Sequence, residues 1–398
     1  MASLIFRKGL DLKQAVAGML ADNYHSALVE QIKTDDFTFK ADRLTIHLAR
    51  EFGFCYGVDR AVDYAYQTRE RFPDRRVFLT GEIIHNPHVN EKLRGMGIEF
   101  MGHDEHALDT LGSNDVVILP AFGVTVSMLA RLDRRGCTLI DTTCGSVLNV
   151  WKNVRRYAEG GYTSIIHGKV WHEETQATAS QAVSYGGRYL VVFDRAETEH
   201  VCDVIRSDAP LDDARRRAFS ERFGGAVSPG FDPDRDLQRI GLANQTTMLM
   251  SESLEVGEML KAAMLDRRGA SALDAHYQAF DTICSATQDR QDAVVALLRS
   301  RPLDLMIVIG GYNSSNTCNL ARICAESRPT YHIADPDCLV SAAEIRHRPI
   351  GAKTEVSATS WLPATGSVTI GLTSGASTPD NLVGAVVARL AGFAQPSA

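Results

Sequence analysis

Hydrophobic and polar positions alternate in a regular rhythm from residue 44 onward. Short β-branched apolar runs such as 44–48 lead into polar or glycine-containing loops, and amphipathic stretches with helical spacing follow. This rhythm is typical of α/β folds with parallel sheets. Residues 1–43 show a mixed pattern that favours a mostly helical N-terminal extension. The stretch 206–236, rich in Arg, Asp, Gly and Pro, interrupts the rhythm and is expected to be a surface insertion.

Three cysteines occupy corresponding positions in this rhythm. Cys55, Cys144 and Cys284 each follow a predicted strand (44–48, 138–140 and 276–280) and precede a predicted helix. A helix N-terminus favours thiolate, the form that ligates iron and zinc. Three converging thiolates could hold a [4Fe–4S] cluster and leave one iron free for substrate. A single such cysteine is more often an ordinary buried residue, but the repeated context favours a metal site.

The remaining cysteines lack this context. Eight cysteines are spread singly, with no Cys-x-x-Cys pair, which fits a reducing compartment and argues against a zinc ribbon. We expect the other five to be structural: Cys137, Cys202, Cys318, Cys324 and Cys338.

Four further strand-to-helix loops are polar: 82–86, 167–174, 313–317 and 374–379. Ligands gather at the carboxyl ends of parallel strands, where such loops lie. The small hydroxyl and amide residues of 313–316 and 374–377 suit an oxygen-rich anion such as a diphosphate, although each stretch alone is equally compatible with a plain helix N-cap. Neither stretch has the Walker pattern, which disfavours nucleotide hydrolysis.

Candidate groups for charge and proton transfer lie in the same loops. His85 and His172 could bind a phosphate or relay a proton, and Glu174 beside a polyanion would suit a general acid. Thr246 and Thr247 could orient such a carboxylate. A lone histidine is usually structural, but His172 and Glu174 stand two apart in one loop.

Composition excludes several classes. The formal net charge of −7 argues against a dedicated nucleic-acid binder. No apolar run approaches the roughly 20 residues of a membrane span, and the N-terminus has no signal-peptide pattern. We therefore expect a cytoplasmic protein with no membrane or nucleic-acid partner.

Together these motifs resemble the LytB/IspH family of 4-hydroxy-3-methylbut-2-enyl diphosphate reductases. The resemblance covers about 44–390, and the N-terminal extension, the 206–236 insertion and the 119–123 stretch resemble its longer branch, typical of oxygenic phototrophs and some bacteria. The motifs that carry it are Gly-Phe-Cys-x-Gly-Val at 53–58, Glu-Ile-Ile-His-Asn at 82–86, Asp-Thr-Thr-Cys at 141–144, His-Glu-Glu-Thr at 172–175, Asn-Gln-Thr-Thr at 244–247, Asn-Ser-Ser-Asn at 313–316 and Ser-Gly-Ala-Ser-Thr-Pro-Asp at 374–380.

The resemblance implies three similar α/β units with small parallel sheets around a central cavity that contains the cluster. We place these units at 44–143, 144–281 and 282–390, followed by a tail at 391–398. It also implies a two-electron reductive dehydroxylation that yields isopentenyl and dimethylallyl diphosphate, with electrons from a ferredoxin or flavodoxin. The implied cluster ligands are Cys55, Cys144 and Cys284, and the implied proton donor is Glu174. The implied diphosphate contacts are His85, His172, Thr246, Ser314, Ser315, Asn316 and Ser377.

Two positions depart from the family's usual pattern. The shorter branch has a second diphosphate-binding histidine where this chain and the longer branch have phenylalanine, here Phe122. Cys144 is followed by Gly145 and Ser146, where the family usually has proline and an apolar residue. Glycine loosens the backbone beside a cluster ligand.

Two competing functions use the same residues. A zinc-dependent hydrolase of a phosphorylated substrate could employ the same thiolates and histidines. A non-catalytic iron–sulfur sensor could retain the fold, although it would need neither Glu174 nor the serine-rich loops.

Overall fold

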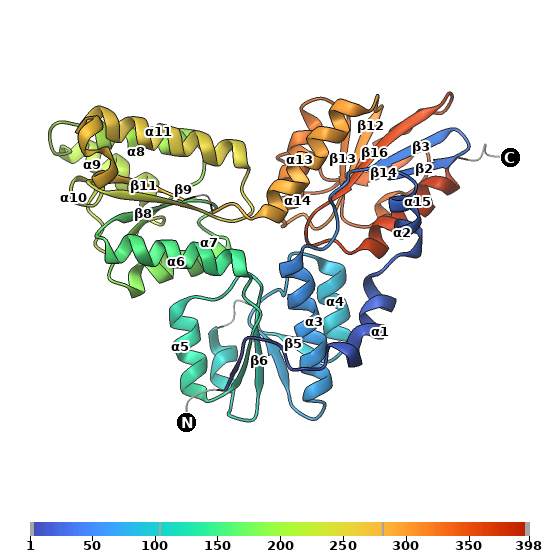
Figure 1. Ribbon diagram of the computed structural model, residues 1–398, viewed down its shortest axis with the longest axis horizontal. Coiled ribbons are helices and arrows are strands. Elements are labelled where there is room, and N and C mark those ends of the chain that lie inside the picture. Colours follow the sequence, from blue (N-terminus) through green and yellow to red (C-terminus); the bar gives the residue numbers. More distant parts are fainter. Residues whose placement is uncertain (1–3, 103–104, 281, 395–398) are drawn as a thin grey trace. The chain divides into compact units, whose positions relative to one another are not determined.

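The computed structural model describes residues 4–102, 105–280 and 282–394 (Figure 1). The chain forms two compact units. One consists mainly of Leu119–Cys284 and is called the Cys144 unit here; the other consists mainly of Phe6–His103 with Ser285–Ala398 and is called the Cys55 unit. Within the described residues, the strands form sheets of five, four and five strands and one two-stranded sheet. The expected α/β fold with several small parallel sheets is confirmed.

The Cys144 unit is built on a parallel sheet with strand order β11-β10-β8-β9. Its central strand β8 (Thr163–His167) is buried along its whole length, as expected for a parallel strand covered on both faces. Helices α8 and α11 cover one face, and α6 and α7 cover the other (Figure 1). Successive β8 residues alternate accordingly, because Ile165 packs in the core under α8 and α11 whereas Ile166 packs in the core with Ala179 of α7.

The remaining elements of this unit are β7 (Thr138–Asp141), β9 (Arg188–Val192), β10 (Ile240–Asn244), β11 (Tyr277–Ala279), η1 (Glu105–Thr110), α5 (Val126–Arg135), α6 (Gly145–Glu159), α7 (Glu173–Ser184), α8 (Arg195–Arg206), α9 (Asp213–Phe223), α10 (Pro233–Asp236), α11 (Met250–Arg268), η2 (Ala270–Ala272) and α12 (Leu273–His276). The segment 206–236, expected as an insertion, contains α9 and α10. Phe219 and Phe223 of α9 are buried in the core beneath α8 and α11.

The Cys55 unit contains a second sheet with strand order β13-β12-β16-β3-β2. Its strands are parallel except β2, which pairs antiparallel with β3. The interior strand β12 (Leu305–Ile309), between β13 and β16, is entirely apolar and buried. Met306 and Val308 pack in a core with α13 and α14, whereas Ile307 and Ile309 pack in a core with α2 and α15. Figure 1 shows these helix pairs on opposite faces of the sheet.

The elements of this unit are β2 (Thr38–Ala41), β3 (Leu44–Leu48), β4 (Val77–Leu79), β5 (Ile98–Phe100), β13 (Thr330–Ile333), β14 (Glu344–His347), β15 (Val356–Thr359), β16 (Val368–Ser374), α1 (Lys13–Tyr24), α2 (Ala27–Thr34), α3 (Tyr56–Arg71), α4 (Pro87–Gly95), α13 (Ser285–Ser300), α14 (Ser315–Ala325), η3 (Pro336–Cys338) and α15 (Asp380–Gly392). Strand β4 pairs parallel with β5 and with residues 116–118 of β6 (Val116–Leu119). The short strand β1 (Ile5–Phe6) precedes α1.

The N-terminal extension is mostly helical, as expected. Ser26 caps α2 by accepting a hydrogen bond from the Val29 amide. Val29 and Ile32 are fully buried in the core shared with β3 and β12, so this helix completes one face of the sheet.

The division into three consecutive units stays a prediction. The two compact units each combine segments that are distant in sequence, so they do not correspond one to one with the three predicted ranges. The tail predicted at 391–398 lies outside the described residues from 395 onward. Among the described helices, none is both long and apolar enough to cross a membrane.

Candidate functional site

Each of the three motif cysteines stands where a helix begins. Cys55 is the N-cap of α3 and Cys144 that of α6, while Cys284 immediately precedes α13. All three side chains are partly exposed. The strand–cysteine–helix context read from the sequence is therefore confirmed in each case, and each thiol lies at the positive end of a helix dipole.

Main-chain contacts hold the Cys144 and Cys284 loops. The Cys144 amide donates to the Ala121 carbonyl at 3.0 Å, and the Thr142 hydroxyl to the Leu119 carbonyl at 2.6 Å. The Cys284 amide donates to the Thr246 carbonyl at 3.2 Å. Asp281, three residues before Cys284, lies outside the described residues.

The Cys55 loop is held by residues from α13 and from the loop after β16. The Cys55 amide donates to the Ala376 carbonyl at 3.1 Å. Buried Arg290 donates to the Gly53 carbonyl at 2.8 Å. Gly53 has φ +78°, and a Cβ there would lie 2.4 Å from an oxygen of Asp380. Only glycine fits this approach to the cysteine.

Four of the five cysteines expected to be structural are buried: Cys137, Cys202, Cys324 and Cys338. Burial raises the pKa of the Cys202 thiol to about 12, so it stays protonated and is a poor metal ligand. Cys318 is partly exposed, and its sulfur accepts a hydrogen bond from Arg348 at 2.9 Å.

Glu174 and Thr246 form a close pair in the Cys144 unit. The Glu174 side chain, in the first turn of α7, is buried. Its Oε1 accepts from the Thr246 amide at 2.6 Å, and its Oε2 lies 3.0 Å from the Thr246 hydroxyl. Of the two threonines suggested to orient such a carboxylate, Thr246 makes these contacts with Glu174, whereas the Thr247 hydroxyl accepts from Gln245 Nε2 at 2.9 Å. Since the Thr246 carbonyl also accepts from the Cys284 amide, this loop links the acid to a motif cysteine.

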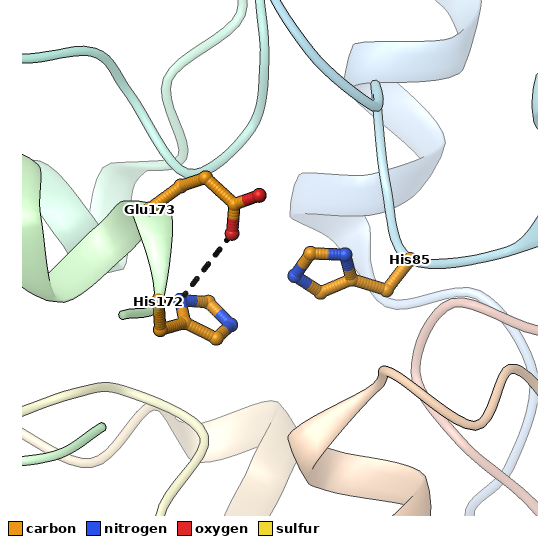
Figure 2. A group of neighbouring side chains, drawn as sticks. All are labelled: His85, His172 and Glu173. Atoms are coloured by element: carbon orange, nitrogen blue, oxygen red, sulfur yellow. Dashed lines mark ion pairs between the residues drawn. The ribbon is translucent and has the colours of Figure 1, made fainter. Parts of the chain in front are cut away.

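His172 caps α7 with its ring. Nδ1 accepts a hydrogen bond from the Glu174 amide at 3.2 Å, so Nδ1 is unprotonated and the neutral ring carries its proton on Nε2. Glu173 Oε2 lies 4.0 Å from Nδ1 (Figure 2), too far for a hydrogen bond. The ring of Phe122, the position that departs from the shorter branch, packs edge-on against His172 with centroids 5.6 Å apart.

The Cys55 unit gathers the remaining candidates. Ser377 donates to the His85 carbonyl at 3.2 Å, and Asn316 Oδ1 accepts from the Ala376 amide at 2.9 Å. Ser314 caps α14 by accepting from the Thr317 amide. All are buried, as is Ser315 in the first turn of α14. Three loops distant in sequence thus meet in this unit.

Sequence reasoning did not assign roles to Glu82 and Asn313, which meet His85. Glu82 Oε2 lies 2.9 Å from His85 Nδ1 and accepts from Asn313 Nδ2 at 2.7 Å. Burial works against ionisation of Glu82, but hydrogen bonds from His85 and Asn313 and the attraction of His85 and Arg94 lower its pKa overall. The sequence signal that could have identified Glu82 as a partner of His85 is its spacing, since Glu82 precedes His85 by three residues in the same loop.

The two units therefore carry two groups of candidates. The Cys144 unit holds Cys144, Cys284, His172, Glu174 and Thr246, and the Cys55 unit holds Cys55, His85, Ser314, Ser315, Asn316 and Ser377. Strand-end thiols at helix N-termini, polar helix caps and a fixed carboxyl are groups of the kind that bind metals and anions in α/β proteins.

Comparison with known proteins identifies the family. The family model described as "LytB protein" matches residues 46–391. A protein of Gloeobacter violaceus is 48% identical over 392 residues, covering 97% of this chain and 91% of its own. One of a Synechococcus strain is also 48% identical, covering 98% and 94%. Both are named 4-hydroxy-3-methylbut-2-enyl diphosphate reductase. The chain belongs to the LytB family.

Solved structures agree with this assignment. A structure described as (E)-4-hydroxy-3-methyl-but-2-enyl diphosphate reductase, the terminal enzyme of the non-mevalonate pathway, is 26% identical with a TM-score of 0.53, covering 87% of this chain and 98% of the other. The reductase structure from Plasmodium falciparum is 21% identical with a TM-score of 0.61, covering 86% of each chain, and supports the fold alone. The similarity to cyanobacterial relatives over nearly the whole chain confirms the resemblance to the longer branch.

Proposed function

We propose that this protein is an oxidoreductase that converts 4-hydroxy-3-methylbut-2-enyl diphosphate into isopentenyl and dimethylallyl diphosphate, the last step of the non-mevalonate isoprenoid pathway. Relatives with this name match almost the whole chain. The structural observation that carries the proposal is the Glu174–Thr246 pair, joined through the Thr246 carbonyl to the amide of Cys284. A buried, oriented acid beside a candidate metal ligand is what removal of a hydroxyl as water requires.

The cluster ligands are proposed to be Cys55, Cys144 and Cys284. Reductases of this family are iron–sulfur enzymes, and these are the cysteines that are both partly exposed and placed at helix starts. Helix-end thiols fit an iron–sulfur group, since thiolate is the ligating form. When bound, a [4Fe–4S] cluster with one iron free of protein ligands would supply electrons and a Lewis acid for the substrate hydroxyl.

The diphosphate is proposed to bind the polar loops through His85, His172, Thr246, Ser314, Ser315, Asn316 and Ser377. His172 is suited to this because its Nδ1 is occupied by the Glu174 amide, which leaves Nε2–H as the donor. Ser314, Ser315 and Asn316 stand at the start of α14, where the helix dipole attracts an anion.

Glu174 is proposed to donate the proton. The Thr246 hydroxyl can donate to Oε2 when the carboxyl is ionised and accept from Oε2–H when it is protonated, while the backbone amide serves Oε1 in both states. The reaction consumes two electrons and two protons: the C–O bond breaks, the hydroxyl leaves with one proton as water, and the other proton goes to carbon. The electrons are proposed to come from a ferredoxin or flavodoxin.

A zinc hydrolase of a phosphorylated substrate is the competing enzyme class, because thiolates and histidines at strand ends also suit zinc. A non-catalytic iron–sulfur sensor is the other alternative, but the buried Glu174 pair has no purpose in a sensor.

The test is anaerobic purification followed by iron, sulfide and zinc analysis and turnover of the allylic diphosphate with reduced viologen. We expect a brown protein with about four iron and four sulfide per chain that forms both products. Serine substitution of Cys55, Cys144 or Cys284 should remove the cluster, whereas Cys202→Ser, away from the helix starts, should retain it. A colourless, zinc-loaded, folded protein would refute the proposal, and a cluster-loaded protein without turnover would favour the sensor.

A further inference from the structure

Arg290 is a buried cation on α13 in the Cys55 unit, and only 4% of its surface is exposed. Its Nη2 atom donates to the Gly53 carbonyl at 2.8 Å and lies 3.5 Å from the Phe52 carbonyl. Its Nη1 atom donates to the Ala286 carbonyl in the preceding turn of the helix at 2.8 Å. This one side chain therefore ties α13 to the loop that leads into Cys55.

The charge of Arg290 has no anionic partner among the residues that the structure describes. Its printed contacts are all with backbone carbonyls, and its buried Nε has no hydrogen-bond partner there either. Asp380 packs against Gly53, but its carboxylate is paired with Lys33 at 3.0 Å. A guanidinium cannot be deprotonated in proteins, and a buried charge without a counter-charge is costly. Arg290 therefore brings a permanent, uncompensated positive charge to this loop.

The charge lies close to a candidate cluster ligand. Gly53 stands two residues before Cys55, and two residues of extended chain span at most about 7 Å. With the hydrogen bond added, the guanidinium lies within roughly 10 Å of the Cα atom of Cys55. The loop also has anchors that do not involve Arg290, because the Cys55 amide donates to the Ala376 carbonyl at 3.1 Å and the Gly53 amide to the Ser374 hydroxyl at 2.9 Å. Replacing Arg290 should therefore remove the charge and leave the loop held at both of these points.

We propose that Arg290 is a counter-charge for the iron–sulfur group and raises its reduction potential. This inference rests on the proposed function and its cluster ligands. The charge of three thiolates outweighs that of a [4Fe–4S] core in its usual states, so the bound group is an anion and becomes more negative on reduction. Because Coulomb attraction grows with charge, a fixed cation stabilises the reduced state more than the oxidised state. With Arg290 in place, the group accepts an electron from its donor protein more readily.

The alternative role for Arg290 is purely structural, as a fork of donors that ties α13 to the carbonyl of Gly53. Two substitutions separate the roles. Arg290→Gln keeps a hydrogen-bond donor and removes the charge. Arg290→Lys keeps the charge but loses the planar fork of the guanidinium. A structural role makes the lysine variant differ from the wild type, whereas a charge role makes its reduction potential the same.

The test measures the midpoint potential of the anaerobically prepared holoenzyme by redox titration followed by electron paramagnetic resonance. Loss of a unit charge about 10 Å away, at an effective dielectric constant of about 20, changes a one-electron equilibrium constant on the order of tenfold. We therefore expect Arg290→Gln to lower the midpoint potential by about 59 mV, the equivalent of a tenfold change. Arg290→Lys should keep the equilibrium constant within about twofold of the wild type. The matched control is Arg299→Gln, which removes an exposed, solvent-screened charge in the last turn of α13 and should also stay within about twofold.

Equal potentials in the wild type and Arg290→Gln would overturn the inference, as would a potential of Arg290→Lys that falls as far as that of Arg290→Gln. If Arg290→Gln holds no cluster, Arg290→Lys decides: a loaded protein with the wild-type potential supports the charge role, and an unloaded or shifted one overturns it.

These outcomes are distinct from failure of the proposed function. A wild-type protein that holds the cluster but does not turn over would refute the reductase activity, while the comparison of potentials would still decide the role of Arg290. A wild-type protein that holds no iron–sulfur cluster would refute both.

Discussion

Replacing Glu174 by glutamine tests the proton donor directly. Glutamine has nearly the same shape, its side-chain oxygen can accept from the Thr246 amide, and the Thr246 hydroxyl can rotate to accept from the new NH₂ group. The fold and the cluster should therefore survive. The variant cannot donate the proton, and loss of a general acid costs about 10² to 10⁴ in rate, or roughly 3–5 kcal/mol in the activation barrier. We expect kcat to fall by this factor with little change in KM.

The assay is steady-state turnover under anaerobic conditions with reduced viologen, normalised to cluster content. Glu173→Gln is the matched control, since its side chain is 40% exposed, and it should retain most activity. Thr246→Val removes the hydroxyl 3.0 Å from Oε2, a contact with a charged group worth about 1.5–3 kcal/mol. It should lower kcat by itself but add little in the Glu174→Gln background. A cluster-loaded Glu174→Gln protein with wild-type kcat would refute the proton-donor role.

Three further predictions concern the fold. Gly123→Ala should lower the free energy of unfolding by about 2–4 kcal/mol, because Gly123 has φ +76° and a Cβ there would lie 2.5 Å from the Trp151 ring. The control Gly145→Ala, where a Cβ would meet nothing within 4 Å, should change the free energy of unfolding by less than about 1 kcal/mol. Equal effects of the two substitutions in denaturant titrations would contradict this. Phe223→Ala should cost about 3–5 kcal/mol, since the ring is 1% exposed in the core of the Cys144 unit; a loss under about 1 kcal/mol would show that the core is loosely packed there. Burial lowers the pKa of His332 from 6.5 to about 4 in the folded protein. As pH drops from about 6.5 to 4, the unfolded chain therefore binds a proton at His332 that the folded protein does not bind, and the free energy of unfolding falls. His332→Asn should reduce the slope of the unfolding free energy against pH in this window by up to about 1.4 kcal/mol per pH unit, and an unchanged slope would contradict the neutral state of His332.

The local structure around each motif was readable from the sequence because it depends on neighbouring residues. The apolar run 44–48 forms strand β3 as predicted, Cys144 stands at the start of α6, and Ser314 caps α14. The sequence also suggests Thr246 and Thr247 as partners of a loop carboxylate, and Thr246 does contact Glu174 although 72 residues separate them.

Contacts between loops that are distant in sequence could not be read in this way. Asn313 reaches Glu82 across 231 residues, and Arg290 reaches Gly53 across 237. Neither pairing follows from periodicity or composition, since it depends on which strand ends the sheets place next to one another. The burial of Phe219 and Phe223 within 206–236 was hidden for a different reason, because the polar composition of that stretch masks two core residues.

The most direct test of the central claim is the electron and product balance of the cluster-loaded protein. Reduced viologen and 4-hydroxy-3-methylbut-2-enyl diphosphate are mixed anaerobically, and the oxidised viologen and the diphosphate products are counted together. The account predicts two electrons consumed for each substrate and the appearance of both isopentenyl and dimethylallyl diphosphate. Release of inorganic phosphate or diphosphate without viologen oxidation would contradict it and identify a hydrolase instead.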